Sequence, residues 1–283
     1  MIKMNIGGVP EHFNLPWHRL LAAGLLGREG IEAQWQDFPG GTGAMISALN
    51  DDAIDVAMLL TEGAVLGIGK GGRFRIVSLY VESPLIWGIH VPAESAFTDV
   101  ESIRGARYAI SRFGSGSHLM CYAHARSLDW PAASLRFEVV GTLDGAVEAF
   151  AAGRADVFLW EKFMTKPLVD SGRFRRIGEF AAPWPAFVVA VSERALGNRR
   201  QDIALVLERV FAEAEAFRAD AAAGEEIAAR FGLDRADAAE WLAATRWARR
   251  VGVETSMLDD VAGLLGAVGL LPPSRDRVFC AAL

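Results

Sequence analysis

Cysteine is scarce in this chain of 283 residues, which contains only Cys121 and Cys280. Neither residue lies in a CxxC pair or at a Cys/His spacing that would hold zinc. A disulfide scaffold and a structural zinc site are therefore not expected. We also expect no cofactor and no other bound metal, because no motif for either is present.

An excess of basic residues is also missing. Lys and Arg total 29 against 35 Asp and Glu, which gives a net charge of −6. Affinity for nucleic acids comes from clustered Lys and Arg, so no nucleic-acid partner is expected. We interpret the one dense basic run, "TRWARR" at Thr245 to Arg250, as the solvated face and end of a helix.

Long apolar runs are absent too. No stretch approaches the roughly 20 residues that a membrane span needs, so no membrane insertion is expected. The N-terminal "MIKMNIGGVPEH" lacks the apolar segment and the small-residue cleavage site of a secretory leader. As it stands the sequence predicts a cytoplasmic location, and a leader trimmed from the chain would make the location periplasmic.

The composition that remains is typical of a well-cored globular protein, with 52% hydrophobic and 23% charged residues. The length suits one large domain or two ordinary ones. Short apolar runs alternate with helical patterns along the first two thirds, which indicates α/β units around mainly parallel sheets. The sequence therefore predicts an α/β fold, and two lobes are the first expectation.

Two stretches of these first two thirds resemble each other. "GAMISALNDDAIDVAMLLTEG" from Gly43 matches "GAVEAFAAGRADVFLWEKF" from Gly145 with one residue deleted, so that Asp55 corresponds to Asp156. "GRFRIV" recurs as "GRFRRI" at nearly the same offset. An offset of about 100 residues is too long for a solenoid repeat. It favours two lobes of related build, with chance similarity between α/β segments as the alternative.

Two extended stretches, "SLYVESPLIWGIHVPA" and "APWPAFVVAVSE", are predicted to cross between the lobes and form a hinge. The expected divisions are 1–86 for the first part of lobe one, 87–186 for lobe two, and 187–283 for the return to lobe one and the C-terminal helices. Beyond Arg199 the chain is predicted to be almost entirely helical. One apolar stripe there is expected to pack onto lobe one: Ile203, Val206, Leu207, Val210, Phe211, Ala214 and Phe217.

Glycine and serine gather at one predicted strand-to-helix junction, "SRFGSGSHLM". Gly114 and Gly116 allow the backbone to approach a ligand closely, and Ser115 and Ser117 can donate hydrogen bonds. A helix start carries a partial positive charge, so a carboxylate, sulfonate or phosphate would suit it. The alternative is an ordinary helix cap. Arg112 either pairs with the ligand anion or forms a surface salt bridge.

Further strand ends are predicted to line the same cleft, because ligands bind beyond the carboxyl ends of strands in open α/β sheets. "FPGGTGA" forms a permissive turn into a helix, and two strands end in a carboxylate residue. Trp160, Trp184 and Phe13 could sandwich a planar group, with core packing as the alternative for each. The predicted ligand-binding residues are His12, Phe13, Gly41, Thr42, Thr61, Glu62, Arg112, Ser115, Gly116, Ser117, His118, Trp160 and Glu161.

The stretches "GGTGAMISALNDDAIDVAMLLTEG" and "YAISRFGSGSHLM" resemble segments of the type II periplasmic-binding-protein superfamily. The similarity is to the branch of nitrate, sulfonate and taurine binders and thiamine-pyrimidine-synthesis-like proteins, and most to an intracellular subgroup of it. It extends over roughly Met4 to Leu196. The resemblance implies a two-lobed α/β fold with a hinge, a C-terminal helical segment and one ligand clamped between the lobes. It also implies an ABC-type membrane transporter as a candidate partner.

The expected function is non-catalytic binding of a small organic anion, namely a carboxylate, a sulfonate or a heterocyclic compound. One alternative is an enzyme of the thiamine-pyrimidine-synthesis or desulfinase type on the same fold. The resemblance speaks against it, because those members use cysteines that this chain lacks before Cys121. Cys121 and His118 lie three residues apart in one predicted helix and are the remaining catalytic pair to consider. Another alternative is a ligand-sensing module that passes a conformational change to a protein partner.

Overall fold

The computed structural model describes residues 1–272 and 277–283, and the chain divides into two compact units. Unit 1 consists of Met1–Ser83, Trp184–Gly266 and Leu271–Leu283, and unit 2 of Pro84–Pro183 and Ala267–Leu270. The chain passes from unit 1 to unit 2 at Ser83–Pro84 and returns at Pro183–Trp184. Both passages occur at a proline, a residue that cannot donate a backbone hydrogen bond to a neighbouring strand.

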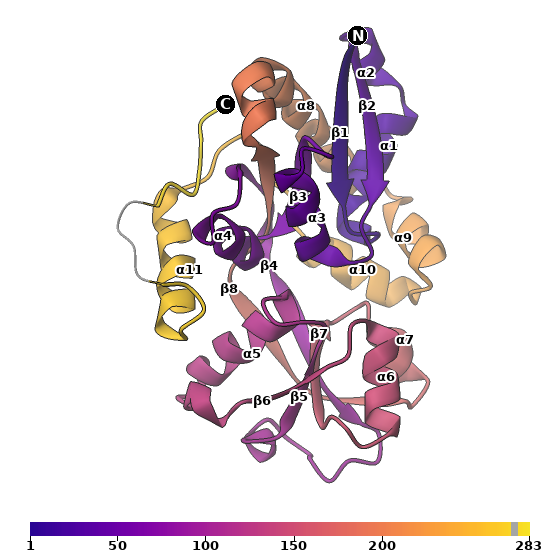
Figure 1. Ribbon diagram of the computed structural model, residues 1–283. Helices are drawn as coiled ribbons and strands as arrows, with labels where there is room; N and C mark the ends of the chain where they lie inside the picture. The colour runs from indigo at the N-terminus through magenta and orange to yellow at the C-terminus, as the bar shows by residue number, and fades with distance from the viewer. Residues whose placement is uncertain (273–276) are drawn as a thin grey trace. The chain divides into compact units, whose positions relative to one another are not determined.

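The described strands form one mixed sheet of eight, and unit 1 contributes the order β2-β1-β3-β8 (Figure 1). β1 pairs in parallel with β2 and β3, and β3 pairs antiparallel with β8. The strands are β1 (Ile2–Gly8), β2 (Ile31–Asp37), β3 (Val56–Leu60) and the C-terminal part of β8 (Phe174–Ser192). The helices are η1 (His12–Asn14), α1 (Leu15–Ala22), α2 (Leu25–Arg28), α3 (Gly41–Asn50), α4 (Thr61–Gly69), α8 (Glu193–Ala219), α9 (Ala223–Phe231), α10 (Arg235–Ala244) and α11 (Thr255–Ala267), which ends at the unit boundary.

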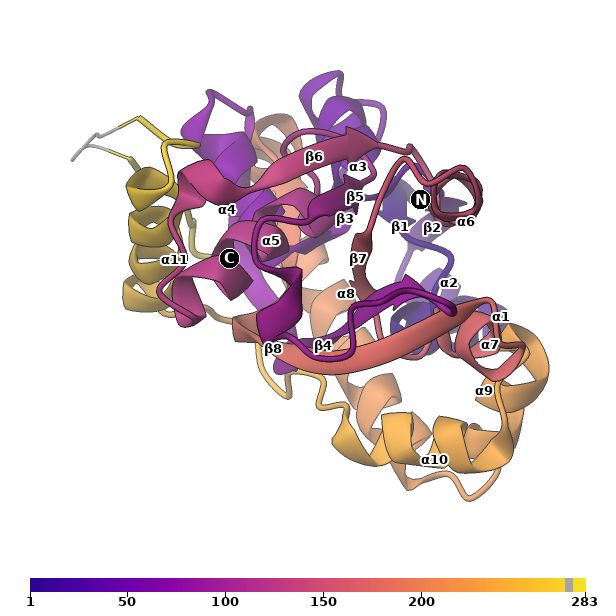
Figure 2. The ribbon, with the colours of Figure 1, turned by 90° about the horizontal axis from the view of Figure 1, so that it is seen from below.

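Unit 2 repeats this plan in the strand order β4-β7-β5-β6 (Figure 2). β5 pairs in parallel with β6 and β7, and β7 pairs antiparallel with β4. The strands are the C-terminal part of β4 (Phe74–Pro92), β5 (Arg107–Ile110), β6 (Arg136–Val139) and β7 (Val157–Glu161). The helices are η2 (Glu101–Ile103), α5 (Gly116–Ser127), η3 (Ala132–Ser134), α6 (Leu143–Ala151) and α7 (Lys166–Asp170).

The predicted correspondence between Asp55 and Asp156 is confirmed by their hydrogen bonds. The Asp55 carboxylate accepts a hydrogen bond from the backbone N–H of Asn5 on β1 at 2.9 Å. The Asp156 carboxylate accepts one from the backbone N–H of Arg107 on β5, also at 2.9 Å. Each aspartate directly precedes a strand, β3 or β7, and therefore fastens the start of that strand to the neighbouring parallel strand, β1 or β5.

The extended stretches are longer than the sequence analysis predicted. β4 and β8 are single strands of 19 residues each, and each begins before the stretch that was predicted to cross between the lobes. A second feature concerns "LPWHRLLAAGLLG", whose apolar residues have the spacing of one continuous helix. It forms α1 and α2, separated by Gly24 with a φ of 65°. Glycine adopts this left-handed conformation at no steric cost, so the helix breaks there.

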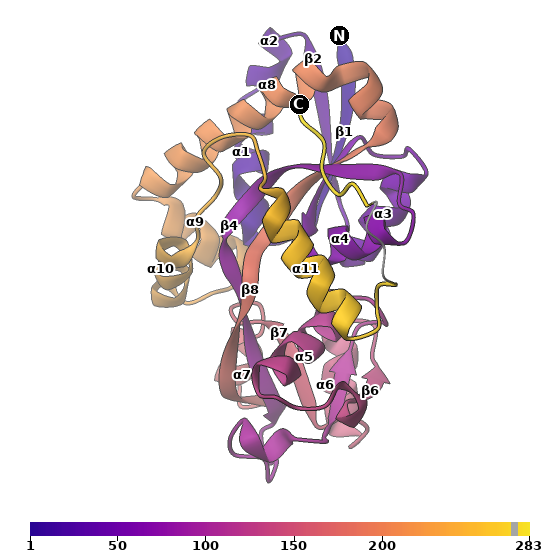
Figure 3. The same cartoon turned by 90° about the vertical axis from the view of Figure 1, so that its left-hand side faces the viewer.

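The C-terminal helices bury the predicted apolar stripe. All seven of its residues lie buried on α8, and α1 packs against this helix (Figure 3). The prediction that "TRWARR" ends a helix is wrong, because α10 ends at Ala244 and the run continues without helical structure. Trp247 is buried and forms a bridge with Val81 of β4, and this pairing requires an extended backbone. Among the described residues no helix is long and apolar enough to cross a membrane.

Candidate ligand-binding site

In unit 1 the beginnings of α3 and α4 lie together. α3 begins at Gly41, which has a φ of 67°. Thr42, the next residue, is buried, and its Oγ1 accepts a hydrogen bond from the backbone N–H of Leu60 at 3.4 Å. Leu60 directly precedes α4. The tertiary structure thus brings the predicted Gly41–Thr42 and Thr61–Glu62 pairs to one place.

The first turn of α4 is held by the residues with which β8 enters unit 1. The Thr61 hydroxyl donates a hydrogen bond to the Pro185 carbonyl at 2.6 Å, and Trp184 Nε1 donates one to Glu62 Oε2 at 2.8 Å. Glu62 is buried, and its Oε1 has no hydrogen-bond partner among the described residues. Burial raises the pKa of Glu62 to about 7, against the lowering effect of the hydrogen bond from Trp184. Near neutral pH this carboxyl group therefore exists in both protonation states.

His12 and Phe13 lie in an aromatic cluster of unit 1. The His12 ring centroid is 4.2 Å from that of Trp241 and 5.3 Å from that of Phe231. The Phe13 ring packs 4.9 Å from Phe187. Burial lowers the pKa of His12 to about 3, so the imidazole is neutral at neutral pH. His12 can therefore offer a ligand a neutral imidazole but no positive charge.

In unit 2 the serine side chains are used to cap α5. Ser115 is the N-cap, and its Oγ accepts a hydrogen bond from the His118 backbone N–H at 3.4 Å. Ser117 Oγ accepts one from the Ser111 backbone N–H at 3.0 Å, and His118 Nδ1 accepts one from Gly114 N–H at 3.0 Å. The alternative of an ordinary helix cap is thus realised locally.

This cap leaves two donors at the beginning of α5. Leu119 N–H is the first to bond to a backbone carbonyl of the turn, that of Ser115, and His118 N–H bonds to the cap. The N–H groups of Gly116 and Ser117 have no hydrogen-bond partner among the described residues. The first N–H groups of a helix have no partner within the helix, and an anion can accept from them.

Arg112 and Phe113 precede these donors in the sequence. Arg112 is half-buried, and burial lowers the pKa of its guanidinium, which still remains charged at neutral pH. Phe113 is 67% exposed, and its ring contacts the edge of His118 with centroids 5.3 Å apart. The sequence analysis missed Phe113, because a single apolar residue between Arg112 and Gly114 looks the same whether it is buried or exposed.

Trp160 and Glu161 lie at the end of β7. Trp160 is half-buried and stacks on Phe158, with ring centroids 5.0 Å apart and planes inclined by 22°. Glu161 is buried, and its Oε2 accepts hydrogen bonds from the backbone N–H groups of Phe163 at 2.9 Å and Met164 at 2.7 Å. Glu161 thus caps the turn that follows β7, whereas Trp160 still presents part of its ring to solvent.

Cys121 lies in the interior of unit 2. The side chain is fully buried, and its Sγ donates a hydrogen bond to the Ser117 carbonyl at 3.1 Å. Burial raises the pKa of the thiol well above neutral pH. Because the thiolate is the nucleophilic form, this environment does not suit catalysis by Cys121.

The chain is similar in sequence and in fold to known proteins. The family model for Ca3427-like PBPs matches residues 87–180. A comparison with curated protein sequences gave no match. The conserved CA3427 gene product of Candida albicans, described as defining a family with the generic periplasmic binding protein fold, is 25% identical with a TM-score of 0.89, over 98% of this chain and 93% of the other.

Two sulfonate-binding proteins have the same fold. The alkanesulfonate-binding protein SsuA of Xanthomonas axonopodis pv. citri, bound to MOPS, is 20% identical with a TM-score of 0.84, over 100% of this chain and 99% of the other. The periplasmic aliphatic sulphonate binding protein SsuA of Escherichia coli is 18% identical with a TM-score of 0.76, over 100% and 94%. The chain has the type II periplasmic-binding-protein fold, and its residues 87–180 match the family model of Ca3427-like PBPs.

Proposed function

We propose that this protein binds a small organic anion bearing a carboxylate or sulfonate group, without converting it chemically. The observation that carries the proposal is the beginning of α5, where the N–H groups of Gly116 and Ser117 have no hydrogen-bond partner in the part of the chain that the structure describes. The partial positive charge of a helix start favours an anion there by about 0.3 to 2 kcal/mol. The neighbouring Arg112 adds a full positive charge.

The body of the ligand is proposed to be apolar or heterocyclic. Phe113 exposes most of its ring beside the start of α5, and Trp160 exposes part of its own. Aromatic rings offer large apolar contact area to a small ligand. The similar protein from Xanthomonas is bound to MOPS, a sulfonate with a morpholine ring, which makes MOPS the first compound to test.

The proposal extends to unit 1, where Thr42 and Glu62 lie at the beginnings of two helices. The other residues of the predicted site stay predictions, either as contacts of the ligand or as supports of its site: His12, Phe13, Gly41, Thr61, Ser115, His118 and Glu161.

An ABC-type transporter is the corresponding proposal for a protein partner. A similar structure from Staphylococcus aureus, 14% identical with a TM-score of 0.73, is described as the ligand-binding component of an ABC-type import system. A cytoplasmic location would instead favour a role in ligand sensing. Fractionation of cells expressing the full-length gene would decide between these two settings.

The function is tested by titration calorimetry with MOPS, ethanesulfonate and benzoate. Ser115→Ala should lower the affinity for the bound anion by about tenfold and the stability by about 1 kcal/mol, because the α5 cap is lost. Ser192→Ala is the matched control, since Ser192 caps α8 with a hydrogen bond from Ala195 N–H at 3.2 Å. It should cost similar stability and leave binding unchanged.

Phe113→Ala should weaken the binding of MOPS more than that of ethanesulfonate, with no loss of stability, because the ring is mostly exposed. Equal affinities of the Ser115→Ala and Ser192→Ala variants for every anion would contradict the proposal. Mass spectrometry of each mixture checks for a product. Turnover of any ligand would show that the protein is an enzyme instead.

A further inference from the structure

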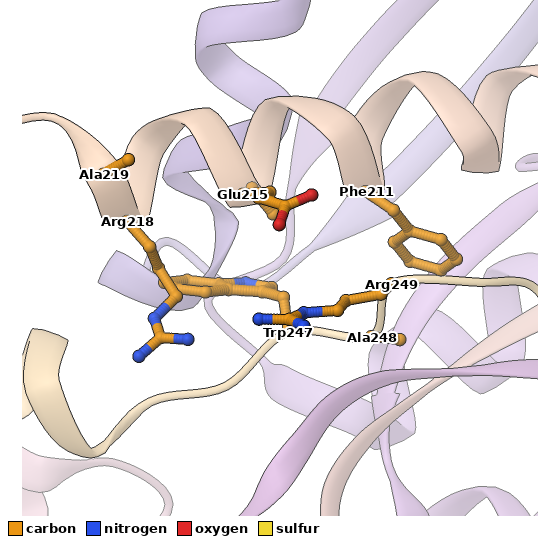
Figure 4. Close-up of a pocket in the computed structure, with 8 residues that line it drawn as sticks. Phe211, Glu215, Arg218, Ala219, Trp247, Ala248 and Arg249 are labelled. Atoms are coloured by element: carbon orange, nitrogen blue, oxygen red, sulfur yellow. The ribbon is translucent and has the colours of Figure 1, made fainter.

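A pocket of 260 Å³ lies within unit 1, lined by α8 and by the segment that follows α10. Glu215 and Arg218 line it from α8, and Trp247 and Arg249 line it from the later segment (Figure 4). Phe211 and Ala214 add apolar surface. None of these residues takes part in the site proposed above, so this pocket needs an account of its own.

Trp247 gives the pocket a rigid wall. The residue is 4% exposed, and its Nε1 donates a hydrogen bond to the Phe13 carbonyl at 2.9 Å. Its ring meets Phe217 and Trp241 edge-on, with centroids 5.7 Å apart in both cases. The indole is thus held on several sides, and a ligand would meet a preformed aromatic surface.

The two arginines that line the pocket, Arg218 and Arg249, differ from Arg209 of α8 in their pairing. Among the described residues neither Arg218 nor Arg249 takes part in an ion pair or a side-chain hydrogen bond. By contrast, Arg209 on the same helix is paired with Glu29. In Figure 4 the side chains of Arg218 and Arg249 approach the same space beside Trp247. Two guanidinium groups at one pocket repel each other, and an anion between them would relieve this repulsion.

Glu215 limits which anion would fit. Its carboxylate borders the same pocket without an ion pair to either arginine among the described residues. It would repel a compact dianion such as phosphate and could accept hydrogen bonds from an ammonium group. Guanidinium groups match the two oxygens of a carboxylate. The pocket therefore offers donors for a carboxylate, an acceptor for an ammonium group and an apolar wall.

We propose that this pocket binds an α-amino acid. Its carboxylate would lie against Arg218 and Arg249, its ammonium group against Glu215, and its apolar side chain along Trp247. The volume is just below the roughly 300 Å³ at which drug-sized ligand pockets begin, which suits a molecule of amino-acid size. The proposal is independent of the anion site at α5.

The test is titration of the full chain with L-leucine, with 4-methylpentanoate, which lacks the ammonium group, and with inorganic phosphate. L-Leucine should bind about tenfold more tightly than 4-methylpentanoate. Arg218→Gln and Arg249→Gln should each weaken L-leucine binding by about tenfold. Glu215→Gln should remove the preference for L-leucine over 4-methylpentanoate. Thermal unfolding of each variant checks that it is folded.

Arg250→Gln is the matched control, because Arg250 is exposed, adjoins Arg249 in sequence and does not line the pocket. It should leave binding unchanged, as should Ser115→Ala. The proposal is overturned if L-leucine does not bind at concentrations up to about 10 mM. It is also overturned if phosphate binds in place of L-leucine, or if Arg250→Gln weakens binding as much as Arg249→Gln.

Discussion

The methyl group of Thr42 occupies the space that a side chain at Gly63 would need. A Cβ atom at Gly63 would lie 2.5 Å from Thr42 Cγ2 but 3.5 Å from Thr42 Cβ. The beginnings of α3 and α4 approach each other this closely because residue 63 carries no side chain. Both helix starts belong to the proposed ligand site of unit 1, so this contact sets how the two are spaced.

Gly63→Ala should therefore destabilise the protein by about 1 to 3 kcal/mol, because the new methyl group forces Thr42 or α4 to move. Adding Thr42→Ser removes the obstructing methyl group, and the double variant should recover most of the loss. Urea unfolding of the four proteins, with Thr42→Ser alone as the control, measures this coupling. A double variant no more stable than Gly63→Ala would show that the contact does not set the spacing.

Glu62 should make stability fall as the pH rises. Its pKa in the folded protein is about 7, above the ordinary value of 4.5. Between these two pH values Glu62 ionises in the unfolded chain but stays protonated in the folded protein. The contribution of Glu62 to the free energy of unfolding is therefore full below about pH 4.5 and is lost by about pH 7. At about 1.4 kcal/mol for each pKa unit, this amounts to about 3 kcal/mol.

Glu62→Gln removes this titration and keeps an oxygen that can accept the hydrogen bond from Trp184. The variant should gain stability relative to the wild type on going from about pH 4.5 to about pH 8. Thermal unfolding at several pH values gives the difference. A difference between the two proteins that does not change with pH would mean that Glu62 ionises normally in the folded state.

His124 should make stability fall as the pH is lowered, which is the opposite of the effect of Glu62. Burial lowers its pKa from 6.5 to about 4, and its Nδ1 has no hydrogen-bond partner among the described residues. As the pH falls from about 6.5 to about 4, His124 is protonated in the unfolded chain but stays neutral in the folded protein. Stability should fall by about 3 kcal/mol over this range.

His124→Leu should flatten this acid dependence, since leucine fits the apolar contacts with Trp130 and Phe180 and does not titrate. Denaturant unfolding at about pH 7 and about pH 5 is sufficient to see the difference. Parallel losses of stability in the wild type and the variant would assign the acid dependence to other groups.

The two corresponding aspartates, Asp55 and Asp156, should contribute different amounts to the free energy of unfolding. Asp55 has a side chain that is 4% exposed and pairs with Arg194 at 2.9 Å and Arg199 at 3.1 Å. Asp156 is 24% exposed and pairs with Arg107 at 2.8 Å. Asp55→Asn should cost about 2 kcal/mol, because the buried carboxylate loses its charge-assisted hydrogen bonds from two partly exposed arginines. Asp156→Asn should cost about 1 kcal/mol. Equal costs in urea unfolding would contradict this ranking.

The order of strands and helices could be predicted from the sequence, because each element of the first two thirds carries its own apolar period. The match between the two stretches of sequence also predicted that Asp55 and Asp156 occupy corresponding positions. The break at Gly24 was not predictable, because glycine is tolerated in a helix as well as at its end. The Trp in "TRWARR" could not be distinguished from a residue on a helix face, because the bridge to Val81 is made far away in the chain.

The candidate site was predictable only in part. Ser115 and Gly116 could be assigned to a helix start because glycine and serine favour such junctions. Phe113 and the pair of Glu62 and Trp184 could not be predicted, since exposure and contacts across 122 residues depend on how the chain folds back.

The sequence by itself determined the α/β plan, its duplication and the helix beginnings that can receive an anion, because these depend on local spacing and on backbone propensity. Only the tertiary structure decided which polar atoms keep a partner. The N–H groups of Gly116 and Ser117, one oxygen of Glu62 and the guanidinium groups of Arg218 and Arg249 have none among the described residues. Whether a donor or acceptor has a partner depends on its neighbours in space, and those neighbours come from distant parts of the chain.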